Sequence, residues 1–416
     1  MNTTMRLPRL DDYRKYTGNK IIDGIREKAR KLKDYHVSHI SSTYYGGGVA
    51  ELLSPLVILM NDAGIKAGWR VIQGSPDYFS VTKKIHNSLQ GGNIRLTRKK
   101  KDIYEGVIYE NSIRNHLDHD AVVIHDPQPL PMINYYKKDR PWIWRCHINT
   151  EKPQEKTWNY LRKYTDKYDA AIFSMNAYKK KMKPEQFVFT PAIDPFCIKN
   201  KKMSRKEVDE RLNKHKIPTD LPIVAQIARF DKWKDPEGVI KAVKKARKEA
   251  DCTLVLLGNA ATDDPEGGEV YKRLMDLREE RIIVISREDT ALVNALQTRA
   301  AVVLQKSIKE GFGISVTEAM WKGAPVIGGN TGGIRLQIDD RKNGYLVDSA
   351  DEAAERIVHL IKNPDKRKTM GKRAREKVKK YYLLPGLVDK YLSLFNSIET
   401  VFKIKKSVVI GKKGGG

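Results

Sequence analysis

Residues 301–320, AVVLQKSIKEGFGISVTEAM, contain a short apolar run, a turn with two glycines and the beginning of a helical pattern near Ser315. This order is typical of a βα unit in a parallel sheet. The same theme returns along the whole chain. In the first half the apolar runs begin near residues 36, 69, 121, 142, 170 and 187, and in the second half near residues 222, 253, 281, 301, 324 and 344. The sequence therefore predicts an α/β fold with parallel sheets.

The chain has 416 residues, which is too many for one ordinary hydrophobic core. A polar segment near residues 200–220, which ends shortly after a proline, separates the two series of apolar runs and marks a domain boundary. We expect one Rossmann-like domain over residues 1–205 and a second over residues 206–384. Residues 385–403 continue an apolar pattern at helical spacing, and the basic tail 404–416 is predicted to be disordered.

Cysteine usage and hydropathy exclude several classes of protein. The three cysteines, Cys146, Cys197 and Cys252, form no CxxC pair and no spacing that suits zinc, so we expect no disulfide framework or structural metal. The N-terminal residues lack the apolar run of a signal peptide, and no segment approaches the roughly 18 apolar residues of a membrane span. We expect a soluble, cytoplasmic protein without stable membrane insertion.

The charge balance is strongly basic, with 78 Lys and Arg against 51 Asp and Glu and a formal net charge of +27. A field of this sign raises the local concentration of nucleotides, nucleic acids and acidic membranes. Lysine-rich surfaces also occur in heat-adapted proteins, and we give that reading the greater weight. No nucleic-acid reader motif accompanies the charge, so we expect no nucleic-acid partner.

Glu310 and Glu318 lie eight positions apart across the glycine turn of EGFGISVTE. The turn between them, Gly311 to Gly313, lies at the positive end of the predicted helix, where backbone amides can bind phosphate. Upstream, Arg229 and Lys234 lie five residues apart at the end of another apolar run. Arg can fork two phosphate oxygens while Lys adds a point charge, so this pair could hold a diphosphate. Together the two motifs suit a sugar nucleotide.

Polar residues also follow the predicted strands of the first half. Three glycines, Gly46 to Gly48, lie between the first strand and an apolar helix, where a backbone without side chains can approach a ligand or simply turn. Asp126, Gln128 and His147 come at the carboxyl ends of later strands, which is where open α/β sheets bind ligands. A strand-end Asp also commonly caps the next helix. The nominal DxD of residues 118–120 precedes its strand, so we reject a metal site there.

The strings GGGVAELL (46–53), HDPQP (125–129) and WRCHINTEKP (144–153), with the Arg/Lys pair and the Glu-x7-Glu spacing, resemble retaining GT-B glycosyltransferases of family GT4. The similarity is to the branch that contains trehalose synthases and trehalose phosphorylases, and it extends from about Tyr44 to Tyr382. It implies two Rossmann-like domains whose parallel sheets face a central cleft, and it implies that the C-terminal helix, residues 385–403, returns to the N-terminal domain.

The resemblance also implies roles for single residues. Glu310 would contact hydroxyls of the transferred sugar, Glu318 would accept both ribose hydroxyls, and Asp126 would meet the acceptor sugar. The ring and carbonyl of His147 would lie near the reacting carbon. The implied catalytic residues are Asp126, His147, Arg229, Lys234 and Glu310. The implied donor site comprises Gly46, Gly47, Gly48, Arg229, Lys234, Glu310, Gly311, Phe312, Gly313 and Glu318, and the implied acceptor site comprises Gly48, Asp126, Gln128 and His147.

The activity that the resemblance implies is retaining transfer of glucose from a nucleoside diphosphate glucose to free glucose, which forms α,α-trehalose. Trehalose phosphorolysis and transfer to a lipid or another sugar acceptor stay open as alternatives, and a nucleic-acid-binding protein has only the net charge in its favour. We expect nucleoside diphosphate glucose and glucose as partners, no required cofactor and no metal site. Mg²⁺ as an activator outside the site, and a homodimer as the assembly, also stay open.

Overall fold

The computed structural model describes residues 6–45, 47–258 and 265–413. The chain divides into two compact units, Met1–Ala192 together with Leu384–Gly416, and Ile193–Leu383. The boundary between the two units, after Ala192, thus lies before the polar segment near residues 200–220 in which the sequence analysis expected it. Each unit contains a six-stranded sheet, and the predicted α/β class with two Rossmann-like folds is confirmed. Within the described ranges, no helix is long and apolar enough to cross a membrane.

The sheet of the first unit has the strand order β2-β1-β3-β4-β5-β6, and all neighbours pair in parallel. The central strands β3, β4 and β5 are buried along their whole length and β1 is buried from Val37 onward, whereas the two edge strands are partly exposed. This burial explains why the interior strands have continuous apolar sequences. The strands are β1 (His36–Ser41), β2 (Lys66–Val71), β3 (Ala121–His125), β4 (Trp142–Arg145), β5 (Ala170–Phe173) and β6 (Glu185–Val188).

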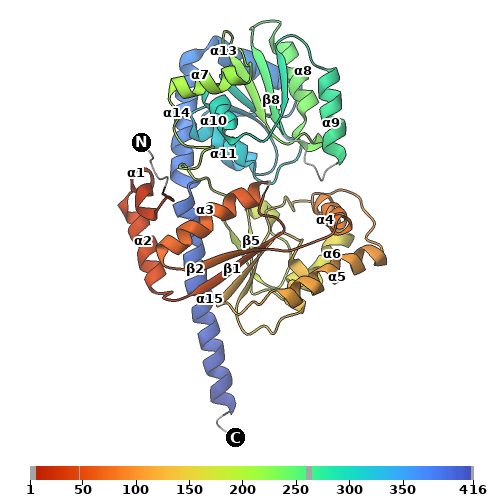
Figure 1. Ribbon diagram of the computed structural model, residues 1–416, viewed down its shortest axis with the longest axis vertical. Coiled ribbons are helices and arrows are strands. Elements are labelled where there is room, and N and C mark those ends of the chain that lie inside the picture. Colours follow the sequence, from red (N-terminus) through yellow and green to blue (C-terminus); the bar gives the residue numbers. More distant parts are fainter. Residues whose placement is uncertain (1–5, 46, 259–264, 414–416) are drawn as a thin grey trace. The chain divides into compact units, whose positions relative to one another are not determined.

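Helices cover both faces of this sheet (Figure 1). One layer contains α2 (Asn19–Arg30), α3 (Gly48–Ala63) and α15 (Leu384–Lys413), and the other contains α4 (Pro76–Leu89), α5 (Arg98–Arg114) and α6 (Glu155–Thr165). Short helical segments complete the unit. These are η1 (Leu10–Tyr13), α1 (Arg14–Thr17), η2 (Leu130–Asn134) and η3 (Asn176–Tyr178).

The C-terminal helix α15 packs on α2 and α3 of the first unit. Its Tyr391 and Phe395 are buried, and their rings contact His39, Phe189 and Tyr35, with ring centroids 5.2 to 5.9 Å apart. This helix therefore contributes directly to the core of the N-terminal unit. It continues to Lys413, so the prediction that the tail from residue 404 is disordered was wrong for residues 404–413. Residues 414–416 lie outside the described ranges.

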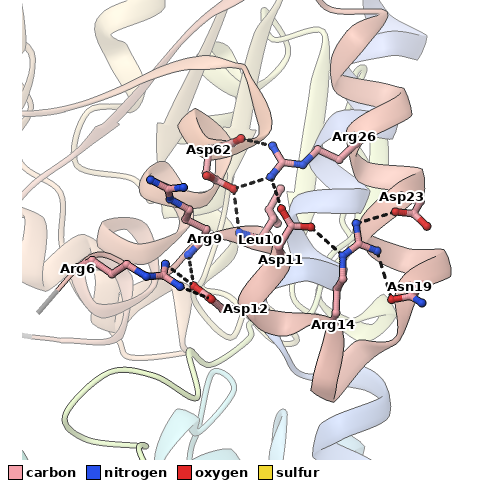
Figure 2. Close-up of polar contacts among 10 residues, drawn as sticks. All are labelled: Arg6, Arg9, Leu10, Asp11, Asp12, Arg14, Asn19, Asp23, Arg26 and Asp62. Atoms are coloured by element: carbon pink, nitrogen blue, oxygen red, sulfur yellow. Dashed lines mark hydrogen bonds and ion pairs between the residues drawn. The ribbon is translucent and has the colours of Figure 1, made fainter.

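The N-terminal segment is joined to the end of α3 by a charged network (Figure 2). Asp62 of α3 accepts hydrogen bonds from the backbone amide of Leu10 (2.9 Å) and from the guanidinium of Arg26 (3.0 Å). Arg26 also pairs with Asp11 at 3.0 Å. Exposed ion pairs contribute at most about 1 kcal/mol each. The full burial of Leu10 and Tyr13 is therefore the larger stabilising contribution of this segment.

The sheet of the second unit has the strand order β12-β11-β10-β7-β8-β9 and is again parallel throughout. The six apolar runs predicted in the second half of the chain all form strands. They are β7 (Ile223–Ile227), β8 (Thr253–Gly258), β9 (Ile282–Ser286), β10 (Val302–Gln305), β11 (Val326–Gly329) and β12 (Gly344–Val347).

The helices of the second unit pack mainly in pairs, α7 on α10, α8 on α13 and α11 on α14. Val224, Leu254 and Val302 of the sheet and Val239 of α8 are fully buried in one hydrophobic core. The helical elements are α7 (Arg205–Lys214), η4 (Lys232–Lys234), α8 (Pro236–Ala246), α9 (Pro265–Asp276), α10 (Thr290–Arg299), α11 (Ile314–Trp321), α12 (Ile334–Gln337), α13 (Ala350–Lys362) and α14 (Pro364–Tyr381).

A close backbone approach joins α14 to the end of α11. Gly371 of α14 lies against Gly323, so a Cβ atom at position 371 would overlap the carbonyl oxygen of Gly323. Backbone atoms cannot give way as a flexible side chain can. The glycine therefore sets how closely α14 packs.

Replacing Gly371 with Ala is expected to destabilise the second unit by about 1–3 kcal/mol, because the added methyl overpacks a backbone contact. The matched control is Gly268→Ala in α9, where nothing lies within 4 Å of an added Cβ. That change should leave stability unchanged or raise it by up to about 1 kcal/mol. Denaturant unfolding of both variants measures the difference, and equal effects would contradict the packing role of Gly371.

Candidate active site

The predicted glycine turn of the second unit lies between β10 and α11. Gly313 has φ 81° and precedes the first residue of α11, Ile314, one residue before the predicted start. The side chain of Gln337 connects the turn to α11. Its Nε2 donates to the carbonyl of Phe312 (2.6 Å), and its Oε1 accepts from Thr317 Oγ1 (2.6 Å). The turn is thus fixed by buried hydrogen bonds, with a left-handed conformation that favours glycine.

Lys234 and Glu310 are brought together although they are 76 residues apart in the sequence. The distance from Lys234 Nζ to Glu310 Oε2 is 2.5 Å, and Ser307 Oγ donates to the same oxygen at 3.2 Å. Both side chains are largely buried, with exposed fractions of 17% and 10%. The pair links the β7–α8 connection to the β10–α11 connection.

Arg229 lies on the same β7–α8 connection as Lys234. Its side chain is 52% exposed, and its guanidinium is 3.5 Å from Asp231 Oδ2. The other oxygen of Asp231 accepts hydrogen bonds from the amides of Trp233 (2.9 Å) and Lys234 (3.1 Å). Asp231 therefore caps η4 and pairs with the predicted phosphate-binding arginine, a role that the sequence did not reveal.

Glu318 is buried in α11, with a side chain only 4% exposed, and the Nζ of Lys199 lies 3.4 Å from its carboxylate. A second lysine, Lys322, donates to the Glu318 carbonyl (3.3 Å) and to the side chains of Asn200 (2.8 Å) and Gln297 (2.9 Å). Burial lowers the pKa of Lys322 from 10.5 to about 8. The charge of Glu318 acts in the opposite direction, and the Lys322 amine stays mostly protonated near pH 7.

The sequence analysis missed both lysines. Lys322 was detectable in principle, because it follows Glu318 by one helical turn. Lys199 lies at the start of a segment that resembles a linker, and no local pattern marks it.

Asp126 follows β3 in the first unit with a backbone φ of 63°, an uncommon conformation for a residue other than glycine. Its backbone amide donates to the Arg145 carbonyl (2.8 Å), and its carbonyl accepts from Trp144 Nε1 (3.0 Å). Its Oδ1 accepts from the backbone amide of His147 at 2.7 Å. Three bonds thus hold a strained residue, a feature that often marks a functional position.

Burial raises the pKa of Asp126 from 3.8 to about 7, while the amide of His147 and the charge of Arg145 act in the opposite direction. The structure thus brings the side chain of Asp126 to the backbone amide of His147. The ring of His147 also contacts His125, whose other nitrogen contacts His39, and each nitrogen to nitrogen distance is 3.0 Å. The sequence did not predict this series of three histidine rings.

The remaining predicted residues of this unit are Gln128, which follows β3, and the three glycines at residues 46–48. Gln128 accepts a hydrogen bond from Tyr78 Oη at its backbone carbonyl (2.8 Å). Its buried side-chain Oε1 has no hydrogen-bond partner among the described residues. Gly47 has φ 93° and precedes α3, which begins at Gly48. Gly46 lies outside the described residues.

The residues of the nominal DxD precede β3, as predicted. Asp120 accepts a hydrogen bond from the His36 amide at the amino-terminal end of β1 (2.9 Å). In the described part of the chain, no group of three or more His, Cys, Asp or Glu side chains is arranged to hold a metal ion.

Residues 39–180 match the family described as trehalose synthase, N-terminal domain, and residues 207–377 match glycosyl transferases group 1. The chain is 42% identical over 399 residues to the trehalose synthase of Thermococcus litoralis, and the aligned region covers 94% of this chain and 97% of that protein. It is 32% identical to the trehalose phosphorylase of Grifola frondosa, over 89% of this chain and 58% of that protein.

Among solved structures, sucrose-phosphate synthase from Thermosynechococcus elongatus superposes with a TM-score of 0.70 at 17% identity, covering 88% of this chain and 100% of that one. Similarity at that identity shows the fold.

Asp126→Asn is expected to change how stability depends on pH. The raised pKa means that folding favours the protonated carboxyl group, so its contribution is complete below pH 3.8 and is lost as the pH rises toward about 7. Asn keeps the shape and tolerates positive φ, but it does not titrate. Between about pH 4 and pH 8 the unsubstituted protein should lose about 4 kcal/mol of stability relative to the variant, because each unit of pKa shift is worth about 1.4 kcal/mol. Urea unfolding across this range measures it, and a difference that does not vary with pH would exclude the shift.

Proposed function

The chain belongs to the trehalose synthase family of glycosyltransferases, and on that premise we propose that it transfers glucose from a nucleoside diphosphate glucose to free glucose, forming α,α-trehalose with retained configuration. The observation that carries the proposal is the pairing of each carboxylate of the Glu-x7-Glu motif with a lysine. Carboxylates paired in this way are strong acceptors for sugar and ribose hydroxyls.

On this proposal the second unit binds the donor. Glu318 accepts the two ribose hydroxyls, and Lys199 and Lys322 maintain its charge. Glu310 accepts hydroxyls of the glucose to be transferred. When the donor binds, Lys234 exchanges part of its contact with Glu310 for a phosphate oxygen, and the half-exposed Arg229 takes other phosphate oxygens.

The first unit supplies the acceptor half-site. Asp126 accepts a hydrogen bond from a hydroxyl group of the acceptor glucose, Gln128 offers the side-chain oxygen that has no partner among the described residues, and His147 completes the group. The glycines before α3 offer backbone amides to the ligand. Because Asp126 titrates near neutral pH, its charge depends on the occupant of the half-site.

We favour front-face transfer for the chemical step. A double displacement requires a carboxylate nucleophile about 5 Å from an acid partner, and none of the residues assigned above has that role. Instead, the bond from the anomeric carbon to the phosphate oxygen breaks while the acceptor oxygen bonds to the same face. The acceptor proton passes to the departing phosphate, whose growing charge Arg229 and Lys234 stabilise.

Trehalose phosphorolysis is the second candidate, because the chain is also similar to trehalose phosphorylases. Inorganic phosphate has no ribose, so that reaction would leave the Glu318 group without a ligand.

Incubation of the purified protein with glucose and ADP-, UDP- or GDP-glucose tests the proposal. The expected products are trehalose and the nucleoside diphosphate, with one donor preferred. If no donor gives product and trehalose is instead cleaved by phosphate, the phosphorylase assignment replaces this one.

Glu318→Gln should raise the KM for the nucleotide donor by about 10- to 100-fold, because a neutral amide cannot replace a charged acceptor for two hydroxyls. The KM for glucose should change little. The control is Glu288→Gln at an exposed position, which should leave both constants unchanged. Steady-state kinetics with each substrate varied separate the two constants. A lower apparent kcat with both KM values unchanged would mean that the replacement only reduces the folded fraction, and it would contradict a role of Glu318 in nucleotide binding.

A further inference from the structure

Three histidine rings form a continuous series across the first unit. His39 lies in β1, His125 ends β3 and His147 follows β4, and these strands are adjacent in the sheet. His39 Nδ1 is 3.0 Å from His125 Nε2, and His125 Nδ1 is 3.0 Å from His147 Nε2. Both distances are those of hydrogen bonds.

The surroundings keep the three rings neutral. His39 is 0% exposed and His125 is 1% exposed. The buried cation Arg145 is the register partner of His125 on the neighbouring strand β4. Burial lowers the pKa of His39 to about 3. Burial, together with nearby charge including that of Arg145, also places the pKa values of His125 and His147 well below the usual value. A charged imidazole would therefore be unfavourable anywhere in the chain.

Neutrality restricts the protons to two arrangements. A neutral imidazole has one N–H and one bare nitrogen, and each hydrogen bond needs one of each. If His39 carries its proton on Nδ1, His125 must accept at Nε2 and carry its own proton on Nδ1, and His147 must do the same. If His39 instead carries its proton on Nε2, all three rings carry it on Nε2. The tautomer of His147 is thus coupled to that of His39, two rings away.

The far end of the series favours the first arrangement. His39 Nε2 is buried and has no hydrogen-bond partner among the described residues. The ring of Tyr391 from α15 packs beside it, with centroids 5.7 Å apart. A buried N–H without an acceptor is rarer in proteins than an acceptor without a donor. A bare nitrogen at His39 Nε2 therefore fits this position better than an N–H.

We infer that the three rings form one neutral hydrogen-bonded chain with every proton on Nδ1, in which His39 and His125 are positioning residues that hold His147 as an Nδ1–H donor. The functional part rests on the proposed function. There, His147 would donate to a sugar oxygen rather than accept a proton, and this leaves the acceptor proton to the departing phosphate.

Imidazole ¹⁵N NMR of the histidine-labelled full chain tests the tautomers without any substrate. The nine histidines of the sequence can be assigned by single replacement. The expected result is a protonated Nδ1 and a bare Nε2 in all three rings. Protonated Nε2 in these rings, mixed tautomers or a charged ring would each overturn the inference. Because no activity is needed, this result stands apart from the failure or success of the proposed reaction.

A matched pair of variants tests the positioning role. In His39→Asn the side-chain amide can donate from the place of Nδ1, whereas His39→Leu has nearly the same shape and no donor. We expect His39→Asn to keep kcat within about twofold and to preserve the Nδ1–H signal of His147. His39→Leu should lower kcat by about fivefold to tenfold, with a smaller change in donor KM and a mixed tautomer at His147. Equal kcat values at equal stability would mean that His39 only fills space.

Discussion

Parallel strand pairing is the constraint on which both half-sites depend. In a parallel sheet the carboxyl ends of neighbouring strands lie at one edge, so residues distant in the sequence meet there. In the first unit this brings Asp126 after β3 to the amide of His147 after β4. In the second unit it brings Lys234 after β7 to Glu310 after β10. The sheets thus create the polar clusters, and the loops supply their chemistry.

Charge compensation distinguishes the two clusters. In the second unit, Glu310 and Glu318 are largely buried and each has a lysine within ion-pair distance. In the first unit, Asp126 has a backbone amide as its hydrogen-bond donor, and burial raises its pKa to about 7. On the proposed function, the lysine-paired carboxylates of the second unit suit a nucleotide sugar, whose hydroxyls need strong acceptors. A carboxyl group that titrates near neutrality suits an uncharged acceptor sugar.

Most of the fold could be predicted because buried parallel strands require continuous apolar runs, and all twelve predicted runs form strands. The placement of Asp126 and Lys234 after their strands could be predicted for the same reason. Contacts set by tertiary packing could not. Lys199 lies near Glu318 but belongs to a segment that resembles a linker. His39 lies within β1, and no pattern in that strand distinguishes it from an ordinary buried residue. The basic composition of the tail suggested disorder, yet α15 continues to Lys413.

Retaining glucosyl transfer is tested most directly by the fate of the anomeric carbon of the donor. A nucleoside diphosphate glucose labelled with ¹³C at C1 is incubated with unlabelled glucose, and the product is analysed by NMR. The account predicts trehalose with label at one anomeric carbon and the α configuration at both. A product with a β linkage, or label in free glucose without any disaccharide, would contradict it.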